Sequence, residues 1–103
     1  MNAMGRTPLH IACEENNVDM CELLLDHSAD IEAVDLQGFT PLHVAVFSGA
    51  AQCTKLLIDR GANVIAKDNA NRTPILVASQ AGQTECGRIV IAKWREFKLA
   101  RPC

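Results

Sequence analysis

Aromatic residues are scarce in this chain, which contains three phenylalanines, one tryptophan and no tyrosine among 103 residues. Apolar residues nevertheless make up 49% of the sequence, so a core must be built mainly from Leu, Ile, Val and Ala. Small aliphatic side chains allow helices to pack at short interaxial distances. The length corresponds to one domain.

Long apolar runs are also missing. No stretch of 18 apolar residues occurs, so we expect no membrane span. Residues 1–6 contain no apolar segment of the kind found in signal peptides. We therefore expect an intracellular protein, in the cytoplasm, the nucleus or both.

Cysteine pairs with metal-binding spacing are absent. The five cysteines form no C-x-x-C motif, and their odd number argues against a disulfide framework. Cys53 and Cys86 are 33 residues apart, and we interpret them as buried residues that act as small hydrophobes. A zinc site is the alternative, but we expect no metal and no cofactor.

Catalytic motifs are lacking as well. The chain has no G-x-S-x-G, no H-E-x-x-H and no glycine-rich phosphate loop. One candidate pair remains, because Cys13 lies three residues after His10 and a thiol beside an imidazole can act as a nucleophile. Cys13 corresponds to Val46 and Ser79 in a repeat described below, so we expect no enzymatic activity.

Charge is unevenly distributed, although the net charge is only −2. Residues 1–38 contain one basic and eight acidic residues, whereas residues 88–103 contain five basic residues and one acidic residue. A basic segment can bind phosphates. Apolar residues interrupt the basic face here, and the acidic segment would repel the same ligand, so we expect no nucleic-acid binding.

A repeat with a fixed period is the strongest signal in the sequence. The block Thr-Pro-Leu-His begins at Thr7 and Thr40, and the variant Thr-Pro-Ile-Leu begins at Thr73, so each interval is 33 residues. Residues 5–37 and 38–70 share twelve identities at this offset. Such a period is typical of solenoids. The threonine predicts a helix N-cap and the proline a first helical position.

The spacing and the T-P-L-H-x-A block resemble the ankyrin repeat over nearly the whole chain. The resemblance implies a single all-α domain, residues 1–103, with short β-hairpin fingers and repeats at about 1–34, 35–67 and 68–103. It also implies that His10 and His43 hydrogen-bond around the threonine and the adjoining loop.

Several local features can be predicted from the repeat. Cys21, Leu24 and Leu25 have helical spacing and are expected to be buried. Ser28 stands where the next repeat has a glycine suited to a left-handed C-cap, and Asn71 stands where the preceding finger has Gly38. Both residues would then need a positive φ.

The third repeat diverges from the other two. Leu76 replaces the histidine, and no glycine ends the last helix, which we expect to cover residues 84–99. Its apolar face, with Trp94 and Phe97, predicts a C-terminal cap in which both rings are largely buried. The alternative is a free helix that binds a partner.

The first residues match the middle of a finger, since Asn2–Gly5 correspond to residues 35–38. This suggests a fragment of a longer array or an engineered ankyrin scaffold. Under that alternative, the role of the chain would be stacking, without a partner of its own.

In ankyrin proteins, finger tips and first helices make a concave ligand surface, and the resemblance implies the same here. The expected partner-binding residues are Arg6, Glu14, Glu15, Leu36, Gln37, Phe39, Phe47, Ser48, Asn69, Arg72 and Gln80. Leu36, Phe39 and Phe47 would be exposed apolar anchors, with Glu14, Glu15 and Arg72 as a charged rim. Alternatively, Phe39 and Phe47 only pack on each other. We expect a non-catalytic, monomeric module that binds another protein.

Overall fold

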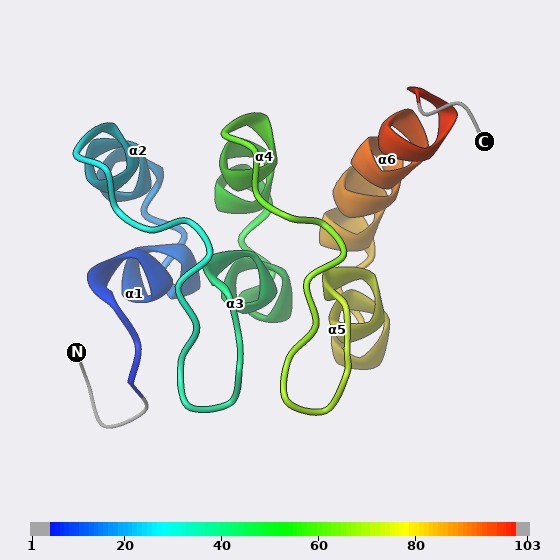
Figure 1. Cartoon of the computed structure of the whole chain (residues 1–103), viewed down its shortest axis with the longest axis horizontal. Helices are drawn as coiled ribbons and strands as arrows, with labels where there is room; N and C mark the ends of the chain where they lie inside the picture. The colour runs from blue at the N-terminus through cyan, green and yellow to red at the C-terminus, as the bar shows by residue number, and fades with distance from the viewer. Residues whose placement is uncertain (1–4, 101–103) are drawn as a thin grey trace.

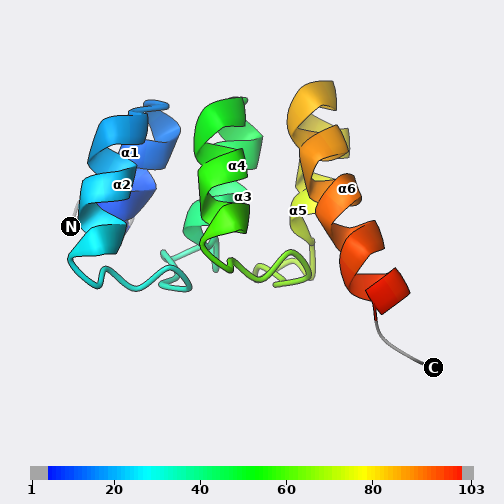
Figure 2. The same cartoon turned by 90° about the horizontal axis from the view of Figure 1, so that it is seen from above.

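The molecule is a stack of three helix pairs. A computed structural model describes the backbone of residues 5–100 and the side chains as far as Glu96. The helices are α1 (Pro8–Glu14), α2 (Val18–Asp26), α3 (Pro41–Ser48), α4 (Ala51–Asp59), α5 (Pro74–Ala81) and α6 (Thr84–Ala100). Helices α1, α3 and α5 form an inner row, and α2, α4 and α6 form an outer row (Figures 1 and 2). The predicted all-helical solenoid is confirmed.

Each inner helix begins in the way that the sequence predicts. Thr7, Thr40 and Thr73 are the N-caps, and each hydroxyl oxygen accepts a hydrogen bond from the backbone N–H three residues later. A proline follows each of them at the first helical position, where the missing N–H leaves no partner unsatisfied. The inner helices are therefore fixed locally before any packing is considered.

The two repeat histidines join successive repeats. Both are fully buried, and in each the Nδ1 atom accepts a hydrogen bond from the N–H of the capping threonine, at 3.1 and 3.2 Å. The Nε2 atom then donates to a carbonyl of the next finger, at 2.7 Å for His10 to Phe39 and 2.8 Å for His43 to Arg72. The predicted structural role of the histidines is confirmed.

The fingers are tight loops organised by a buried aspartate. In the first described finger, Asp35 Oδ1 accepts the N–H groups of Gln37 and Phe39 at 2.8 and 3.0 Å. Asp68 binds the N–H groups two and four residues on in the same way. The expected strands of a β-hairpin do not form within residues 5–100, because the carboxylate takes N–H groups that a ladder would use. Both loops project away from the outer row (Figure 1).

Left-handed backbone occurs at both positions where the sequence predicts it. The φ angles are +67° at Ser28 and +63° at Asn71. Asn16 has a φ of +54° and was not predicted, although Gly49 and Gly82 stand at the matching places of the next repeats. Serine and asparagine pay a steric cost in this region that glycine avoids.

The core runs along the stack between the two rows. Leu42, Leu57 and Val90 are completely or almost completely buried in it. Leu24 and Leu25 were expected to be buried like Cys21, but both are only partly buried at the edge of the core. Among the described helices, the main contacts of α2 are with α1 and α4, and Leu24 and Leu25 lie at the margin of this packing.

Helix α6 continues well beyond the length of the other outer helices, as predicted. It passes the position where the second repeat has Gly61, with a φ of +91°. Trp94 was expected to be largely buried, but it is only partly buried against the core. The Phe97 side chain lies outside the described residues. No helix in the described part of the chain is long and apolar enough to cross a bilayer.

Candidate functional site

Three side-chain pairs form a row across the inner helices, and we call them the paired row. Each pair joins the base of a finger to a residue at the end of the following inner helix, eight positions later. The pairs are Arg6 with Glu14, Phe39 with Phe47, and Arg72 with Gln80. Because α3 packs against both α1 and α5, the aromatic pair lies between the two polar pairs.

The aromatic pair has one buried and one exposed member. Phe39 was expected to be exposed, and this is wrong, since only 4% of its surface is accessible. The Phe39 ring stacks on His43 with centroids 5.5 Å apart. The guanidinium of Arg72, which belongs to the next finger, lies 5.5 Å from the centroid of the Phe39 ring. Phe47 is tilted against Phe39 at 6.2 Å and remains 53% exposed. Phe39 and Phe47 thus pack on each other, as the alternative expectation states. The Phe47 ring nevertheless still faces solvent.

The backbone around Phe47 is held from the next repeat. The Gln83 side chain donates from Nε2 to the Phe47 carbonyl at 3.3 Å. Sequence reasoning did not identify Gln83. Its repeat position is the one that Ala50 occupies in the second repeat, directly after Gly49. The ring of Phe47 therefore packs on Phe39, and the backbone that carries it is bonded to the next repeat.

Leu36 is the most exposed of the predicted anchors. It lies at the tip of the first described finger with 71% of its surface accessible. Its carbonyl accepts a hydrogen bond from Asn69 Nδ2 at 3.0 Å, and the Asn69 N–H donates to the Gln37 carbonyl at 3.0 Å. These bonds tie the two finger tips together, and the expected contact residues Gln37 and Asn69 are both exposed.

The predicted charged rim is largely composed of ion pairs. Arg6 contacts Glu14 and also Asp35, at 3.2 Å from Nε to Oδ2, and its side chain is only 11% exposed. Arg72 pairs with Asp68 at 2.8 Å. Burial raises the pKa of Asp68, but hydrogen bonds from the N–H groups of Arg72 and Ala70 and from the Arg72 guanidinium outweigh this, so its pKa is below the ordinary value.

The remaining expected contact residues are accessible. Glu15, Ser48 and Gln80 are exposed near the ends of the three inner helices. Glu15 and Ser48 occupy the same position in successive repeats. Together with the paired row, they give a surface that is polar at both flanks and apolar at Phe47.

His10 is not available as a base for Cys13, the candidate nucleophile. The nitrogens of His10 are engaged by Thr7 and by the Phe39 carbonyl, and burial lowers the pKa of the imidazole more than the Phe39 bond raises it. The Cys13 sulfur contacts Cys21, 3.6 Å away. The geometry therefore does not arrange Cys13 and His10 as a catalytic pair.

The fold defines a class of protein, the solenoid built from stacked helix pairs whose loops project as fingers. A family model described as ankyrin repeats (3 copies) matches residues 1–68. The chain belongs to the ankyrin repeat family. No curated protein matches it. Members of this family generally mediate protein–protein interactions and are generally not catalytic.

Proposed function

We propose that this protein binds another protein through the finger and inner-helix surface, with Phe47 as the central contact. The observation that carries the proposal is the 53% exposure of Phe47 above a buried aromatic base. Aromatic anchors near the centre of an interface commonly contribute most of the binding energy. The rest of the surface would then act as a polar surround.

The chemistry of the surface indicates what kind of partner segment would fit. Phe47 and the finger-tip residue Leu36 offer apolar contact, whereas the Arg6–Glu14 and Arg72–Asp68 pairs have most of their charge neutralised internally. A strongly charged segment would find few unpaired charges there. We therefore propose a partner segment with an apolar side chain at its centre and uncharged polar groups on both sides.

Preorganisation supports the same assignment. Phe39 and the Gln83 bond hold Phe47 in place before any partner arrives. An anchor that is already ordered loses little conformational entropy on binding. Phe47 is therefore exposed to a partner while its ring packs on Phe39 and its backbone is held by Gln83.

The test compares Phe47→Ala with Leu23→Ala, a matched control. Leu23 lies on α2 in the outer row and is 50% exposed, so it has similar accessibility on a different surface. A photoreactive amino acid placed at position 47, and separately at position 23, first identifies the protein that crosslinks in extracts. Affinity for that protein is then measured with both alanine variants.

We expect Phe47→Ala to weaken binding by about 2 kcal/mol or more, which is roughly thirtyfold. Leu23→Ala should leave affinity unchanged, and each variant should lose about 1 kcal/mol of stability or less. Equal affinity of both variants for the crosslinked protein would refute the proposed site. Loss of folding stability in Phe47→Ala with unchanged affinity would assign the ring to the core instead.

A further inference from the structure

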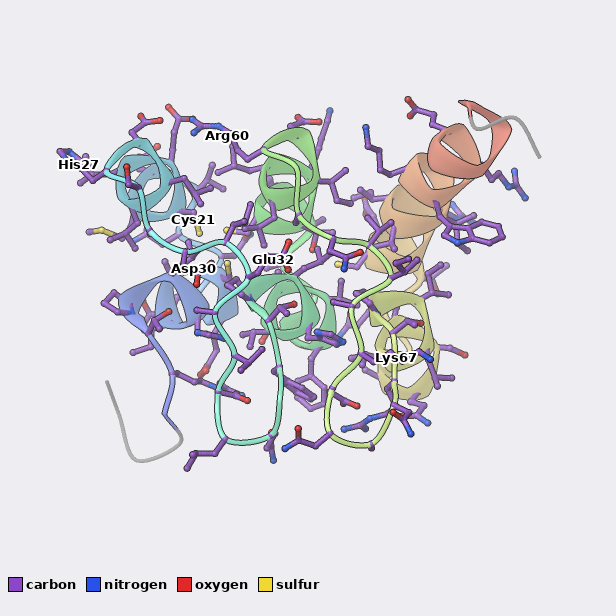
Figure 3. All side chains as sticks on the ribbon, viewed as in Figure 1. Cys21, His27, Asp30, Glu32, Arg60 and Lys67 are labelled. Carbon is purple, nitrogen blue, oxygen red and sulfur yellow. The ribbon has the colours of Figure 1, made fainter. Side chains whose placement is uncertain are left out.

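Three cysteine sulfurs meet inside the first two repeats. Cys13 on α1, Cys21 on α2 and Cys53 on α4 are all fully buried. The sulfur of Cys21 lies 3.6 Å from that of Cys13 and 3.3 Å from that of Cys53, and all three lie within 4.8 Å of one another. Cys21, labelled in Figure 3, comes from the outer row. Residues from three helices therefore place three soft donor atoms around one point.

The next junction of the stack shows that packing does not require this arrangement. The residues 33 positions after Cys13 and Cys21 are Val46 and Thr54, and the partner across that junction is Cys86. There the Thr54 hydroxyl donates to the Cys86 sulfur at 3.7 Å, where the first junction has a contact between two thiols. Burial as small hydrophobes accounts for each cysteine separately, but not for the meeting of all three.

Among the described residues, no His, Asp, Glu or further Cys side chain joins the three sulfurs as a ligand. The nitrogens of His10 are engaged by Thr7 and by the Phe39 carbonyl. Asn16 accepts a hydrogen bond from the Cys53 N–H with its side-chain oxygen, at 3.4 Å, and donates from its side-chain nitrogen to Gln52. Structural zinc sites are almost always four-coordinate and tetrahedral. The site therefore suits a thiophilic element that is satisfied by three sulfurs.

The net charge of the complex distinguishes between the elements that three thiolates could bind. Thiols that bind a metal lose their protons, so the site would carry three negative charges before the ligand is counted. An unpaired charge is very costly in a buried site. A monovalent ion such as copper(I) would leave two negative charges and a divalent ion would leave one, whereas a trivalent element leaves none.

We propose that Cys13, Cys21 and Cys53 form a binding site for trivalent arsenic, which enters as arsenite in its neutral form, As(OH)₃. Three arsenic–sulfur bonds form and three arsenic–oxygen bonds break. The three thiol protons leave with the three hydroxyl groups as water. Arsenic stays trivalent and sulfur is not oxidised, so the exchange needs no other reactant.

The thiols also differ in their readiness to react. Hydrogen bonds from Cys13 and Cys21 lower the pKa of Cys53 to about 7, against the opposing effect of burial. Hydrogen bonding to Cys21 and Cys53 and burial raise the pKa of Cys13.

Burial of the site predicts slow uptake. The ligand reaches the sulfurs only when α2 and α4 separate locally, so association should be accelerated by low concentrations of urea that leave the protein folded. Once bound, arsenic links α1, α2 and α4. A ligand that binds only the folded state stabilises it by mass action, so the melting temperature should rise with arsenite concentration.

The test uses the reduced full chain, incubated with sodium arsenite and analysed by native mass spectrometry. We expect one arsenic atom per chain with the loss of three protons, together with near-ultraviolet absorption from arsenic–sulfur bonds. Cys13→Val and Cys21→Thr each copy the residue of the next junction, which makes them mild substitutions. Each should weaken arsenite binding at least tenfold, whereas Cys86→Ala, which removes a buried thiol outside the cluster, should not.

Circular dichroism melts establish that each variant is folded, and either cluster variant is sufficient for the test. Binding of arsenite by Cys13→Val or Cys21→Thr with wild-type affinity would overturn the proposal. Tighter binding of zinc(II) or copper(I) than of arsenite by the wild-type chain would overturn it as well, since the charge argument would then fail. Selective loss of binding in the cluster variants would support it.

Discussion

Two junctions join the three repeats, one between the first and second repeats and one between the second and third. They share the same framework of hydrogen bonds but differ in their interior residues. In both, a histidine donates to a carbonyl of the next finger, at 2.7 and 2.8 Å. The interior of the first junction contains three thiols, whereas that of the second has Thr54 and Cys86. At the surface, Arg60 pairs with Asp26 across the first junction, and Arg72 covers Phe39 across the second.

The comparison separates what the repeat needs from what each junction adds. The capping threonines, the histidines and the finger aspartates recur because they satisfy backbone groups that would otherwise be buried without partners. The ion pair and the ring contact each occur at one junction only, and an exposed ion pair contributes little to folding stability. Substitutions in the shared framework should therefore cost more than substitutions in the variable links.

The largest effect is expected at Leu57, which lies on α4 between both junctions and is fully buried. Leu57→Ala should lower the free energy of unfolding by about 2–5 kcal/mol, a large share of the roughly 5–15 kcal/mol available to a domain. Leu24→Ala, at the matching position of the first repeat, should cost less because Leu24 is only partly buried. Urea unfolding midpoints measure both, and equal losses would contradict the position of Leu24 at the margin of the packing.

The histidine bonds can be removed one junction at a time with His10→Leu and His43→Leu, since Leu76 shows that the third repeat has leucine there. Each unpaired buried group should cost about 1–3 kcal/mol. Amide hydrogen exchange should accelerate in the finger that follows each substitution, at 35–39 for His10→Leu and at 68–72 for His43→Leu. Acceleration in both fingers for either variant would show that the junctions are not independent.

Acid should weaken both junctions through the same residues. Burial is the main cause that lowers the pKa of His10 and His43 from 6.5, and it outweighs the bonds to Phe39 and Arg72. As the pH falls, the unfolded chain therefore binds protons on these histidines before the folded chain does. The contribution of the neutral histidines to folding stability is complete above pH 6.5 and is lost as the pH falls from 6.5 through their folded-state pKa values. Urea midpoints in this range should fall less in the two leucine variants than in the wild type.

A smaller loss, about 1–2 kcal/mol, is expected for Asp68→Asn, because the amide keeps an acceptor oxygen but loses its charge-assisted bonds. The pKa of Asp68 is below its ordinary value of 3.8 in the folded state. Its stabilising contribution is therefore complete above pH 3.8 and lost as the pH falls from there toward the folded-state pKa. Thermal melts between pH 5 and pH 3 should show a weaker acid dependence in Asp68→Asn, and an unchanged dependence would contradict this assignment.

The smallest effect is expected for Asp26→Asn, which breaks the ion pair with Arg60 at 2.8 Å. Both side chains are well exposed, at 54% and 36%, so the loss should be about 0–1 kcal/mol. Added salt should reduce the difference between variant and wild type. A loss comparable to that of Asp68→Asn would mean that the surface links are part of the framework.

Local features could be predicted from the sequence because they depend on a few neighbouring residues. The threonine caps follow from the chemistry of the Thr-Pro pair, and the positive φ of Ser28 and Asn71 follows from comparing residues 33 positions apart. The histidine role follows from the resemblance to the ankyrin repeat. The same comparison could have identified Asn16, which matches Gly49 in the second repeat.

Features that depend on contacts between repeats could not be predicted in the same way. The Phe39 ring is in contact with His43, Phe47 and Arg72, the last from another finger, and periodicity does not show which side chain covers which. The thiol cluster depends on an offset of 32 residues between Cys21 and Cys53, one less than the repeat. Thr54 and Cys86 have the same offset, so the structure explains the pairing, but the period alone does not.

The forward direction of the histidine bond has a consequence for the engineering of longer arrays. Each histidine needs a finger that follows it, and Leu76 offers no nitrogen to a finger placed beyond the third repeat. An added fourth repeat would lack the histidine bond to its finger unless Leu76→His were introduced. It would also require α6 to stop where Gly61 stops α4, so that the chain could turn back and build the new finger.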